Sequence, residues 1–278
     1  MAGMLYLVPT PIGNLGDISI RCRQTLEEAD FIAAEDTRVT LKLLNHLGIK
    51  KSLVSYYEHN KAFKGDKIVE RILAGETCAL VSDAGSPAIS DPGEDLVKQC
   101  AVAGIPVCAI PGPCAAITAL SISGQSTGRF CFEGFLSTSK KSRREHLESL
   151  QSEQRTMIFY EAPHKLLSTL EDLRDTFGEA RGISLCRELT KLHEEVVRTT
   201  LGEAVAKYTE NPPKGEFVLI VAGAEAPVKE EASETDAAAR VAQLMGEGLS
   251  RKDAVKQTAK ELGLPKNVVY DIALKDPE

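Results

Sequence analysis

Five carboxylates could act as a base in a group-transfer reaction: Glu35, Asp36, Glu161, Glu188 and Glu194. A positioned carboxylate can accept the proton of a weakly acidic hydroxyl. Adjacent residues on a strand point to opposite faces, so only one of Glu35 and Asp36 is expected to face a substrate. Asp36 could instead cap the next helix and pair with Arg38, and Glu188 could form a structural ion pair within Arg187–Lys191. Glu35, Asp36 and Glu188 are the candidate catalytic residues.

Three glycine- and proline-rich loops follow predicted strands, at Pro9–Asp17, Val81–Pro87 and Ile110–Ala116. Ligands of open α/β sheets lie beyond the carboxyl ends of the strands, and glycine lets the backbone approach a ligand closely. Asp83 can accept hydrogen bonds from ligand hydroxyl or amino groups. The first loop has a GxxG pattern in place of GxGxxG, and no GxxxxGK[ST] occurs, so phosphate-cradling cofactors are disfavoured. Each loop alone could be a simple turn, but the shared design predicts a ligand cleft.

Two groups of cations could contact nucleic-acid phosphates. The segment Lys140–Arg144 holds four cations in five residues, and five more lie in the tail, at Arg251, Lys252, Lys256, Lys260 and Lys266. Such clusters bind phosphate even in proteins whose total charge is acidic. A solvated helix start is the alternative for the first group. Dimerisation is the alternative for the alanine-rich helical tail.

Composition bounds the class of protein. The 278 residues are 43% hydrophobic and carry a net charge of −7, which predicts a globular chain of about two domains that is not coated in DNA. No apolar stretch approaches the ~20 residues of a membrane span, and no secretion signal opens the chain. Seven cysteines without a CxxC pair favour reduced thiols in a cytoplasmic protein, and five histidines without ligand-like spacing predict no metal site.

The order of elements predicts an α/β fold. Expected strands at 5–8, 31–34, 53–57, 78–81 and 106–110 alternate with helices at 19–28, 37–47, 60–74, 95–103 and 113–123. Unbroken apolar strands alternating with helices predict a parallel sheet covered on both faces. We assign these elements to an N-terminal α/β domain, 1–124.

Beyond residue 124 the pattern changes. Strands at 130–135, 157–160, 183–187, 196–201 and 217–221 have fewer helices between them, which predicts a second α+β domain over 125–223. The Ala, Glu, Pro, Ser and Thr composition of 224–235 indicates a linker. A small helical, helix-turn-helix-like domain is expected over 236–278, with Ser250 and Asp253 as a capping pair and Gly263 as a C-cap.

Seven ordered blocks carry a resemblance to a known family: Leu7–Leu15, Ala34–Arg38, Ser82–Pro87, Ile110–Pro113, Phe132–Phe135, Phe159–His164 and Arg187–Lys191. Together they resemble the ribosomal RNA small-subunit methyltransferase I family of the tetrapyrrole methylase superfamily. The resemblance covers residues 4 to 223 in order, and the tail also fits. Members that modify tetrapyrroles carry a GDP motif where this chain has Ser82–Pro87, which favours an RNA substrate. Cys114, Ser137 and Ala162 replace the more usual serine, proline and serine, which puts a hydroxyl contact at 114 in doubt.

The resemblance implies a two-domain tetrapyrrole-methylase-like fold, of the class III S-adenosylmethionine (SAM) methyltransferases, with a small C-terminal helical domain. It implies SAM-dependent 2′-O-methylation of a cytidine in the decoding region of 16S ribosomal RNA, usually by a homodimer. Carried over by motif or strand order, the cofactor-binding residues are Pro9, Asp83, Ala84, Gly85, Ser86, Pro87, Ala88, Pro111, Cys114, Ala115, Tyr160, Leu189 and Gly215.

The expected partners follow from the same resemblance and from the cations. The substrate would be 16S RNA within the small ribosomal subunit, with neither DNA nor a membrane as partner. The candidate RNA-binding residues are Arg38, Lys140, Lys141, Arg143, Arg144, His164, Arg251, Lys252 and Lys256. Two alternatives stay open: a SAM-dependent C-methyltransferase acting on a tetrapyrrole precursor, and a non-enzymatic RNA-binding assembly factor.

Overall fold

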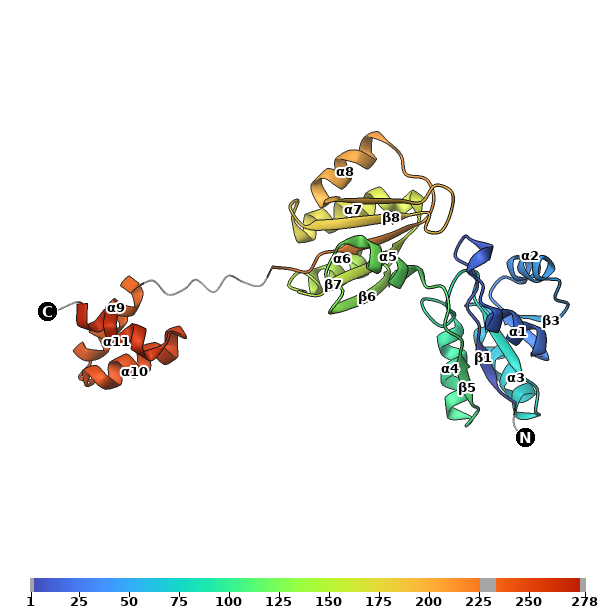
Figure 1. Cartoon of the computed structure of the whole chain (residues 1–278), viewed down its shortest axis with the longest axis horizontal. Coiled ribbons are helices and arrows are strands. Elements are labelled where there is room, and N and C mark those ends of the chain that lie inside the picture. The colour runs from blue at the N-terminus through green and yellow to red at the C-terminus, as the bar shows by residue number, and fades with distance from the viewer. Residues whose placement is uncertain (1–2, 226–233, 276–278) are drawn as a thin grey trace. The chain divides into compact units, whose positions relative to one another are not determined.

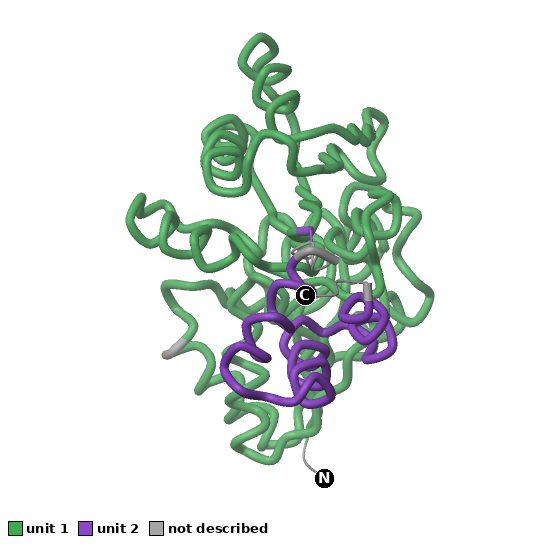
Figure 2. The backbone as a smooth tube through the Cα atoms, turned by 90° about the vertical axis from the view of Figure 1, so that its left-hand side faces the viewer, with its two compact units in different colours: residues 1–224 green, residues 225–278 purple. Residues whose placement is uncertain are grey.

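The computed structural model of the chain describes residues 3–225 and 234–275. Residues 1–224 form one compact unit and residues 225–278 a second, shown in green and purple in Figure 2. Of the predicted linker, 224–235, residues 226–233 lie outside the described residues, and residues 234 and 235 already belong to a helix. Each unit is described by itself.

The larger unit begins with a five-stranded parallel sheet. Its strands are β1 (Leu5–Leu7), β2 (Phe31–Ala34), β3 (Ser52–Ser55), β4 (Cys78–Val81) and β5 (Val107–Ala109), in the order β3-β2-β4-β1-β5. Strands β2 and β4 are buried along their whole length, because helices cover both of their faces. The predicted parallel sheet is confirmed, with strand ends shifted by one or two residues.

Four helices cover this sheet in two layers. Helices α1 (Ile20–Glu28) and α2 (Thr37–Leu47) share a hydrophobic cluster with one face. Helices α3 (Lys61–Leu73) and α4 (Gly93–Val102) share a cluster with the other face. Ser19 caps α1 through the backbone N–H of Cys22, and Gly48 ends α2 in the left-handed region at φ +73°.

The strand order creates a switch point between β1 and β4. From β1 the chain crosses through α1 on one face of the sheet, whereas from β4 it crosses through α4 on the other face. The loops that follow the two strands therefore separate and leave a crevice beyond their carboxyl ends, where open α/β sheets bind ligands. The loop after β1 includes a short 3₁₀ turn, η1 (Leu15–Asp17).

A second, mixed sheet completes the larger unit. It contains β6 (Phe130–Phe135), β7 (Thr156–Glu161), β10 (Phe217–Val221), β8 (Gly182–Arg187) and β9 (Glu195–Thr200), in that order across the sheet. Only the β6–β7 pair is parallel. Helices α6 (Lys140–Ser149), α7 (Pro163–Phe177) and α8 (Leu201–Glu210) pack on one face, where α7 and α8 are visible in Figure 1. The segment after residue 124, where the sequence predicts more strands and fewer helices, thus forms a mixed sheet.

Helix α5 (Ala115–Ser123) packs against the opposite face of the second sheet. Its Ala116, Ala119 and Leu120 share a cluster with Ile158 and Val218 of that sheet. The division predicted at residue 124 had placed this helix with the first sheet, so by packing the change of layer comes before α5. The helix also starts later than predicted: Cys114 is its N-cap, and Pro113 precedes the helix.

Residues 234–275 of the smaller unit form three helices, α9 (Glu234–Gly246), α10 (Arg251–Leu262) and α11 (Lys266–Lys275). Val241, Val255 and Val269 supply one residue from each helix to its core. Ser250 accepts a hydrogen bond from the N–H of Asp253, and Gly263 ends α10 in the left-handed region, as expected.

Three expected absences can be compared with the described residues. Among residues 3–225 and 234–275, no helix is long and apolar enough to cross a membrane. In the same part of the chain, no three histidine, cysteine or acidic side chains converge as metal ligands. All seven cysteines lie within it, and each is a free thiol.

Candidate functional site

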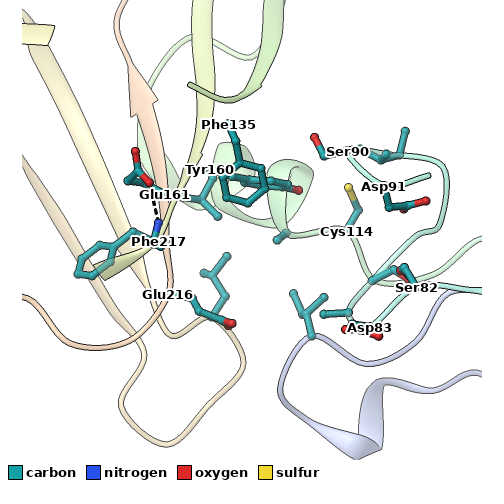
Figure 3. A pocket seen from close by; sticks show the side chains of 18 of the residues that line it. Ser82, Asp83, Ser90, Asp91, Cys114, Phe135, Tyr160, Glu161, Glu216 and Phe217 are labelled. Carbon is teal, nitrogen blue, oxygen red and sulfur yellow. Dashed lines mark hydrogen bonds between the residues drawn. The ribbon is translucent and has the colours of Figure 1, made fainter. Parts of the chain in front are cut away.

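A pocket of about 460 Å³ lies between the loops of the first sheet and the second sheet. In Figure 3, Ser82, Asp83, Asp91 and Cys114 lie on one side of it, and Tyr160, Phe135 and Glu216 on the other. Its volume falls within the usual range of small-molecule sites. The predicted residues that line it are Glu35, Asp83, Ala84, Gly85, Ser86, Cys114, Ala115, Tyr160 and Leu189. The predicted residues outside its lining are Asp36, Pro9, Pro87, Ala88, Pro111, Glu188 and Gly215.

The three glycine- and proline-rich loops are tied together beneath this pocket. Thr10 and Gly85 exchange backbone hydrogen bonds of 3.0 Å in both directions. The Ser86 hydroxyl donates to the carbonyl of Pro113 at 2.9 Å. A Cβ on Gly112 would come within 2.7 Å of the Pro9 Cβ, so only glycine lets the first and third loops approach this closely. Pro9 therefore contacts the third loop, and neither Pro9 nor Pro111 lines the pocket.

Strained backbone is concentrated at the pocket. Within the described ranges, the non-glycine residues with positive φ are Ala88 (68°), Ser90 (64°), Glu188 (50°) and Thr190 (66°). Each pair belongs to one loop, and the two loops lie on opposite sides of the pocket. L-residues avoid this region, and it persists where surrounding contacts impose it, often at binding sites.

Asp91 holds the first strained loop. One of its carboxylate oxygens accepts hydrogen bonds from the N–H groups of Ala88, at 3.0 Å, and Gly93, at 2.7 Å. These bonds stabilise the left-handed turn at Ala88 and Ser90. Asp91 lines the pocket, and sequence reasoning did not single it out.

The first-sheet side of the pocket carries three carboxylates, which we call the acidic wall: Glu35, Asp83 and Asp91. None of them forms a salt bridge in the described part of the chain. Burial, followed by the nearby charges of Asp83 and Asp91, raises the pKa of Glu35. Burial likewise raises the pKa of Asp83, although its carboxylate accepts a 3.0 Å hydrogen bond from the N–H of Asp36. The acidic wall therefore favours a cationic ligand group.

The opposite side also carries a carboxylate, but it is paired, and we call it the paired wall: Lys191 and Glu216 line the pocket, and Glu188, outside the lining, pairs with Lys191. Lys191 Nζ lies 2.9 Å from Glu188 and 2.9 Å from Glu216. The hydrogen bond from Lys191 lowers the pKa of Glu188. A Cβ on Gly215 would come within 2.5 Å of the Glu188 side chain, so Gly215 leaves room for this ion pair.

The start of α5 forms the floor between the two walls. Cys114 accepts no capping hydrogen bond with its side chain, and Cys114 and Ala115 both line the pocket. The Tyr160 hydroxyl accepts a hydrogen bond from the N–H of Ala116 at 3.0 Å, which fixes the tyrosine ring against the helix start. Burial raises the pKa of Tyr160 to about 12, so it stays a neutral phenol.

These features fit a ligand that is flat at one end and cationic in its middle. Ile12, Leu189 and Val218 supply apolar contact, and the small residues 84–86 leave their backbone accessible. The acidic wall suits a positive charge, and the first turn of α5 suits a carboxylate. S-adenosylmethionine has each of these groups, so the residues present fit it.

Two predicted catalytic residues have other partners. Asp36 caps α2 through the N–H of Arg38 and forms a 2.6 Å ion pair with that arginine, which lowers the pKa of Asp36 to about 2. Asp36 therefore has the structural role given above as the alternative to catalysis, that of a helix cap paired with Arg38. Glu188 belongs to the paired wall. Of the three candidates, only Glu35 lines the pocket with a raised pKa.

The predicted RNA-binding residues of α6 divide into two groups. Lys140, Lys141 and Arg144 are exposed. Arg143 is only 11% exposed, lies 2.5 Å from Asp172 and donates to Thr169. It is committed to the α6–α7 packing and is the weakest RNA candidate of the four.

The remaining RNA candidates are at the surface. His164 is exposed in the first turn of α7, and Arg38 is exposed beside the pocket. Arg251, Lys252 and Lys256 are exposed along α10. None lines the main pocket.

Comparison with known proteins gives the family. Residues 4–205 match the Tetrapyrrole (Corrin/Porphyrin) Methylases, and residues 231–276 match the RsmI C-terminal HTH domain. A Synechocystis sp. protein named "Ribosomal RNA small subunit methyltransferase I" is 49% identical over 98% of both chains. A protein of the same name from Halalkalibacterium halodurans is 50% identical over 97% of this chain and 94% of its own.

A solved structure supports the fold. Uroporphyrin-III C-methyl transferase from Thermus thermophilus, complexed with S-adenyl homocysteine, matches 78% of this chain and 97% of its own, with a TM-score of 0.56 and 16% identity. The predicted α/β fold and the prediction of S-adenosylmethionine as methyl donor are confirmed. The chain belongs to the tetrapyrrole methylase family and, within it, to the family of ribosomal RNA small subunit methyltransferase I.

Proposed function

We propose that this protein transfers a methyl group from S-adenosylmethionine to the 2′-oxygen of a cytidine ribose in the decoding region of 16S ribosomal RNA. The observation that carries the proposal is the similarity to relatives named for ribosomal RNA methylation, which extends over both units of the chain. The specific position rests on the family resemblance of the seven sequence blocks.

The pocket residues account for the chemistry as follows. When bound, S-adenosylmethionine supplies an electrophilic methyl group on a positively charged sulfur. Asp83 and the first turn of α5 would hold and orient this donor, and the acidic wall would compensate its charge. Glu35 would accept the proton of the ribose hydroxyl whose oxygen takes the methyl group. Its raised pKa makes it a better base than Asp36 or Glu188, whose pKa values are lowered.

The RNA would be held by surfaces outside the pocket. Lys140, Lys141 and Arg144 on α6 supply exposed positive charge in the larger unit. Arg251, Lys252 and Lys256 do so on α10 in the smaller unit. Phosphate contacts of this kind provide affinity and register, while the pocket selects the reacting group. We include Arg38 and His164 as weaker candidates.

The cellular context is part of the proposal. Seven free thiols suit a reducing compartment, and the substrate places the protein in the cytoplasm. We retain the homodimer implied by the resemblance and the three predicted domains, 1–124, 125–223 and 236–278, with the first boundary moved to before α5 because that helix packs on the second sheet. The substrate is the small ribosomal subunit, with neither DNA nor a membrane as partner.

Mass spectrometry of 16S ribosomal RNA tests the function. A strain lacking the protein should lack one 2′-O-methylcytidine in the decoding region. The wild-type gene should restore this mark, and the Glu35→Gln gene, expressed at the same level, should not. A methylated cytidine that persists without the protein would sink the proposal. Turnover of a tetrapyrrole precursor, or RNA binding without S-adenosylmethionine binding, would support one of the alternatives.

A further inference from the structure

Strand β6 carries three exposed phenylalanines on one face: Phe130, Phe132 and Phe135 are 40%, 36% and 60% exposed. Exposed aromatic rings are costly in water, so a group of them calls for an explanation. Residues 130 and 132 share a face because strand side chains alternate. Residue 135 would point to the opposite face if the strand were regular.

A β-bulge keeps Phe135 on the same face. The pairing of β6 with β7 shifts between Phe132 and Gly134, so that Phe132 pairs with Ile158 and Phe135 with Tyr160. Gly134 adopts φ +63°, a conformation that suits glycine, and Glu133 is the extra residue. Bulges of this kind re-aim side chains next to active sites.

Two of these rings, those of Phe132 and Phe135, lie against Tyr160, a residue that lines the main pocket. Phe132 and Phe135 make edge-to-face contacts with Tyr160, with ring centroids 5.1 and 5.4 Å apart. Figure 3 shows Phe135 beside Tyr160 at the edge of the pocket. The two rings are therefore held in place while much of their surface stays exposed.

A second cavity, of about 520 Å³, opens over these rings. It is lined by Phe132, Glu133, Gly134 and Phe135 from β6, and by Ala88, Ile89, Ser90 and Glu94 from the facing segment. Ile89, Ser90 and Phe135 also line the main pocket. The strained loop at Ala88 and Ser90 is thus a partition between two adjoining cavities.

We propose that this second cavity, the base ledge formed by Phe132, Phe135 and Ile89, binds the unstacked nucleobase of the nucleotide whose ribose is methylated. The inference rests on the proposed function. When a ribose enters the main pocket, the base bonded to that ribose must lie directly beside the pocket. The base ledge is in that place, because Ile89, Ser90 and Phe135 line both cavities. Bases extruded from RNA stack on aromatic side chains and bind through their exposed edges.

The Ser90 hydroxyl lies at the rim and can hydrogen-bond the exposed edge of a base. The Glu133 carboxylate is instead held 2.8 Å from His146 Nε2 of α6, on the face of the sheet opposite Tyr160. Five residues beyond Phe135, α6 begins with Lys140 and Lys141, so cationic side chains follow the ledge along the same segment.

The variant Phe132→Leu tests the base ledge. Leucine keeps an apolar side chain but removes the stacking ring. With small ribosomal subunits from a strain lacking the protein as substrate, the variant should raise the KM for subunits roughly tenfold. The KM for S-adenosylmethionine should stay unchanged. Phe130→Leu is the matched control, since Phe130 is equally exposed on the same strand face but lies outside the cavity.

The outcomes separate the inference from the function on which it rests. If the wild-type protein methylates no ribosomal RNA, the proposed function fails. If it does and the two leucine variants behave alike, the base ledge is wrong. A weaker binding of S-adenosylmethionine by Phe132→Leu in calorimetry would mean that Phe132 only supports Tyr160. A change in sedimentation of this variant would mean that a second copy covers the ledge. Either result overturns the inference.

Discussion

The two walls of the main pocket carry the same kind of side chain in opposite electrostatic states. On the acidic wall, burial is the first cause that raises the pKa values of Glu35 and Asp83, and neighbouring carboxylates add to it: Asp83 and Asp91 act on Glu35, and Asp36 acts on Asp83. On the paired wall, Lys191 neutralises its neighbours and lowers the pKa of Glu188. A carboxylate without a cation destabilises the apo fold, whereas a paired one stabilises it. The unpaired carboxylates are therefore the ones that can bind a cationic ligand, whereas the paired ones hold the loops in place.

The same contrast recurs on α6. Arg143 is a buried member of a hydrogen-bonded chain that runs through Thr169 to Glu161, which itself lines the pocket. Lys140 and Lys141, at the start of the same helix, are exposed. Neighbouring cations that look equivalent in the sequence thus have different roles.

The largest expected effect is on catalysis. Glu35→Gln removes the proposed base and should lower kcat about 100-fold, with a smaller loss of S-adenosylmethionine affinity, because it also removes one charge of the acidic wall. Glu188→Gln, on the paired wall, is the matched control and should stay close to wild type in kcat. In the wild-type protein, activity should fall as the pH drops through the raised pKa of Glu35, because only the carboxylate accepts a proton. Steady-state kinetics across pH checks this, and equal losses in the two variants would remove the distinction between the walls.

The next effect is on cofactor binding. Asp83→Ala should weaken S-adenosylmethionine binding roughly tenfold to a hundredfold, because it removes a charged hydrogen-bond acceptor from the donor's site. Calorimetry measures the dissociation constant, and circular dichroism confirms that the fold is intact. Glu216→Ala on the paired wall should have a smaller effect. Unchanged affinity in Asp83→Ala would remove Asp83 from the site.

The exposed cations of α6 and its paired Arg143 should differ in how they affect the salt dependence of RNA binding. Neutralising Lys140, Lys141 and Arg144 to glutamine should weaken RNA binding and lower the slope of log affinity against log salt by about 2. Replacing Arg143 with methionine should instead destabilise the fold, because Asp172 loses its cationic partner and Thr169 loses the hydrogen bond that Arg143 donates.

A second triple variant provides the control for charge. Lys64, Lys67 and Lys98 lie on α3 and α4, and glutamine at these positions removes the same number of charges. Its salt slope should match the wild type. An unaltered slope in the α6 triple variant would mean that α6 does not contact phosphate.

The smallest expected effect is on the free energy of unfolding, which variants of Glu35 and of Glu188 should change in opposite directions. Burial raises the pKa of Glu35 above its ordinary value of 4.5. The stability that the protonated Glu35 contributes is therefore lost as the pH rises through the raised pKa of the folded state. Glu188 has a lowered pKa, so it contributes stability at neutral pH that is lost on acidification. At neutral pH, Glu35→Gln should therefore raise the free energy of unfolding, and Glu188→Gln should lower it, each by up to about 1 kcal/mol. Urea denaturation of the apo protein checks both signs, and two changes in the same direction would contradict the comparison.

Much of the fold could be predicted because its signals are local. Strands such as Phe31–Ala34 and Cys78–Val81 are apolar runs between turn residues, and Gly48 marks a helix end. Asn60 shows the limit. Asparagine is a favoured N-cap residue, yet Asn60 makes no capping bond at the start of α3; its side chain instead accepts from the N–H of Tyr57 and donates to the carbonyl of Ser55.

The site was less predictable because it depends on contacts between distant segments. Glycine patterns located the loops, but the approach of Gly13 to Lys191 follows from the packing of two sheets. Asp91 and Glu216 belong to no pattern that stands out locally. The segment Phe132–Phe135 was noted as a sequence block, yet the bulge that aligns its two rings appears only in the strand pairing.

A crystal structure of the protein with bound S-adenosylhomocysteine tests the central claim most directly. The account predicts that the ligand occupies the main pocket, contacts Asp83 and the first turn of α5, and directs its sulfur toward Glu35. A ligand bound outside this pocket, or one whose sulfur faces Lys191 on the paired wall, would contradict it.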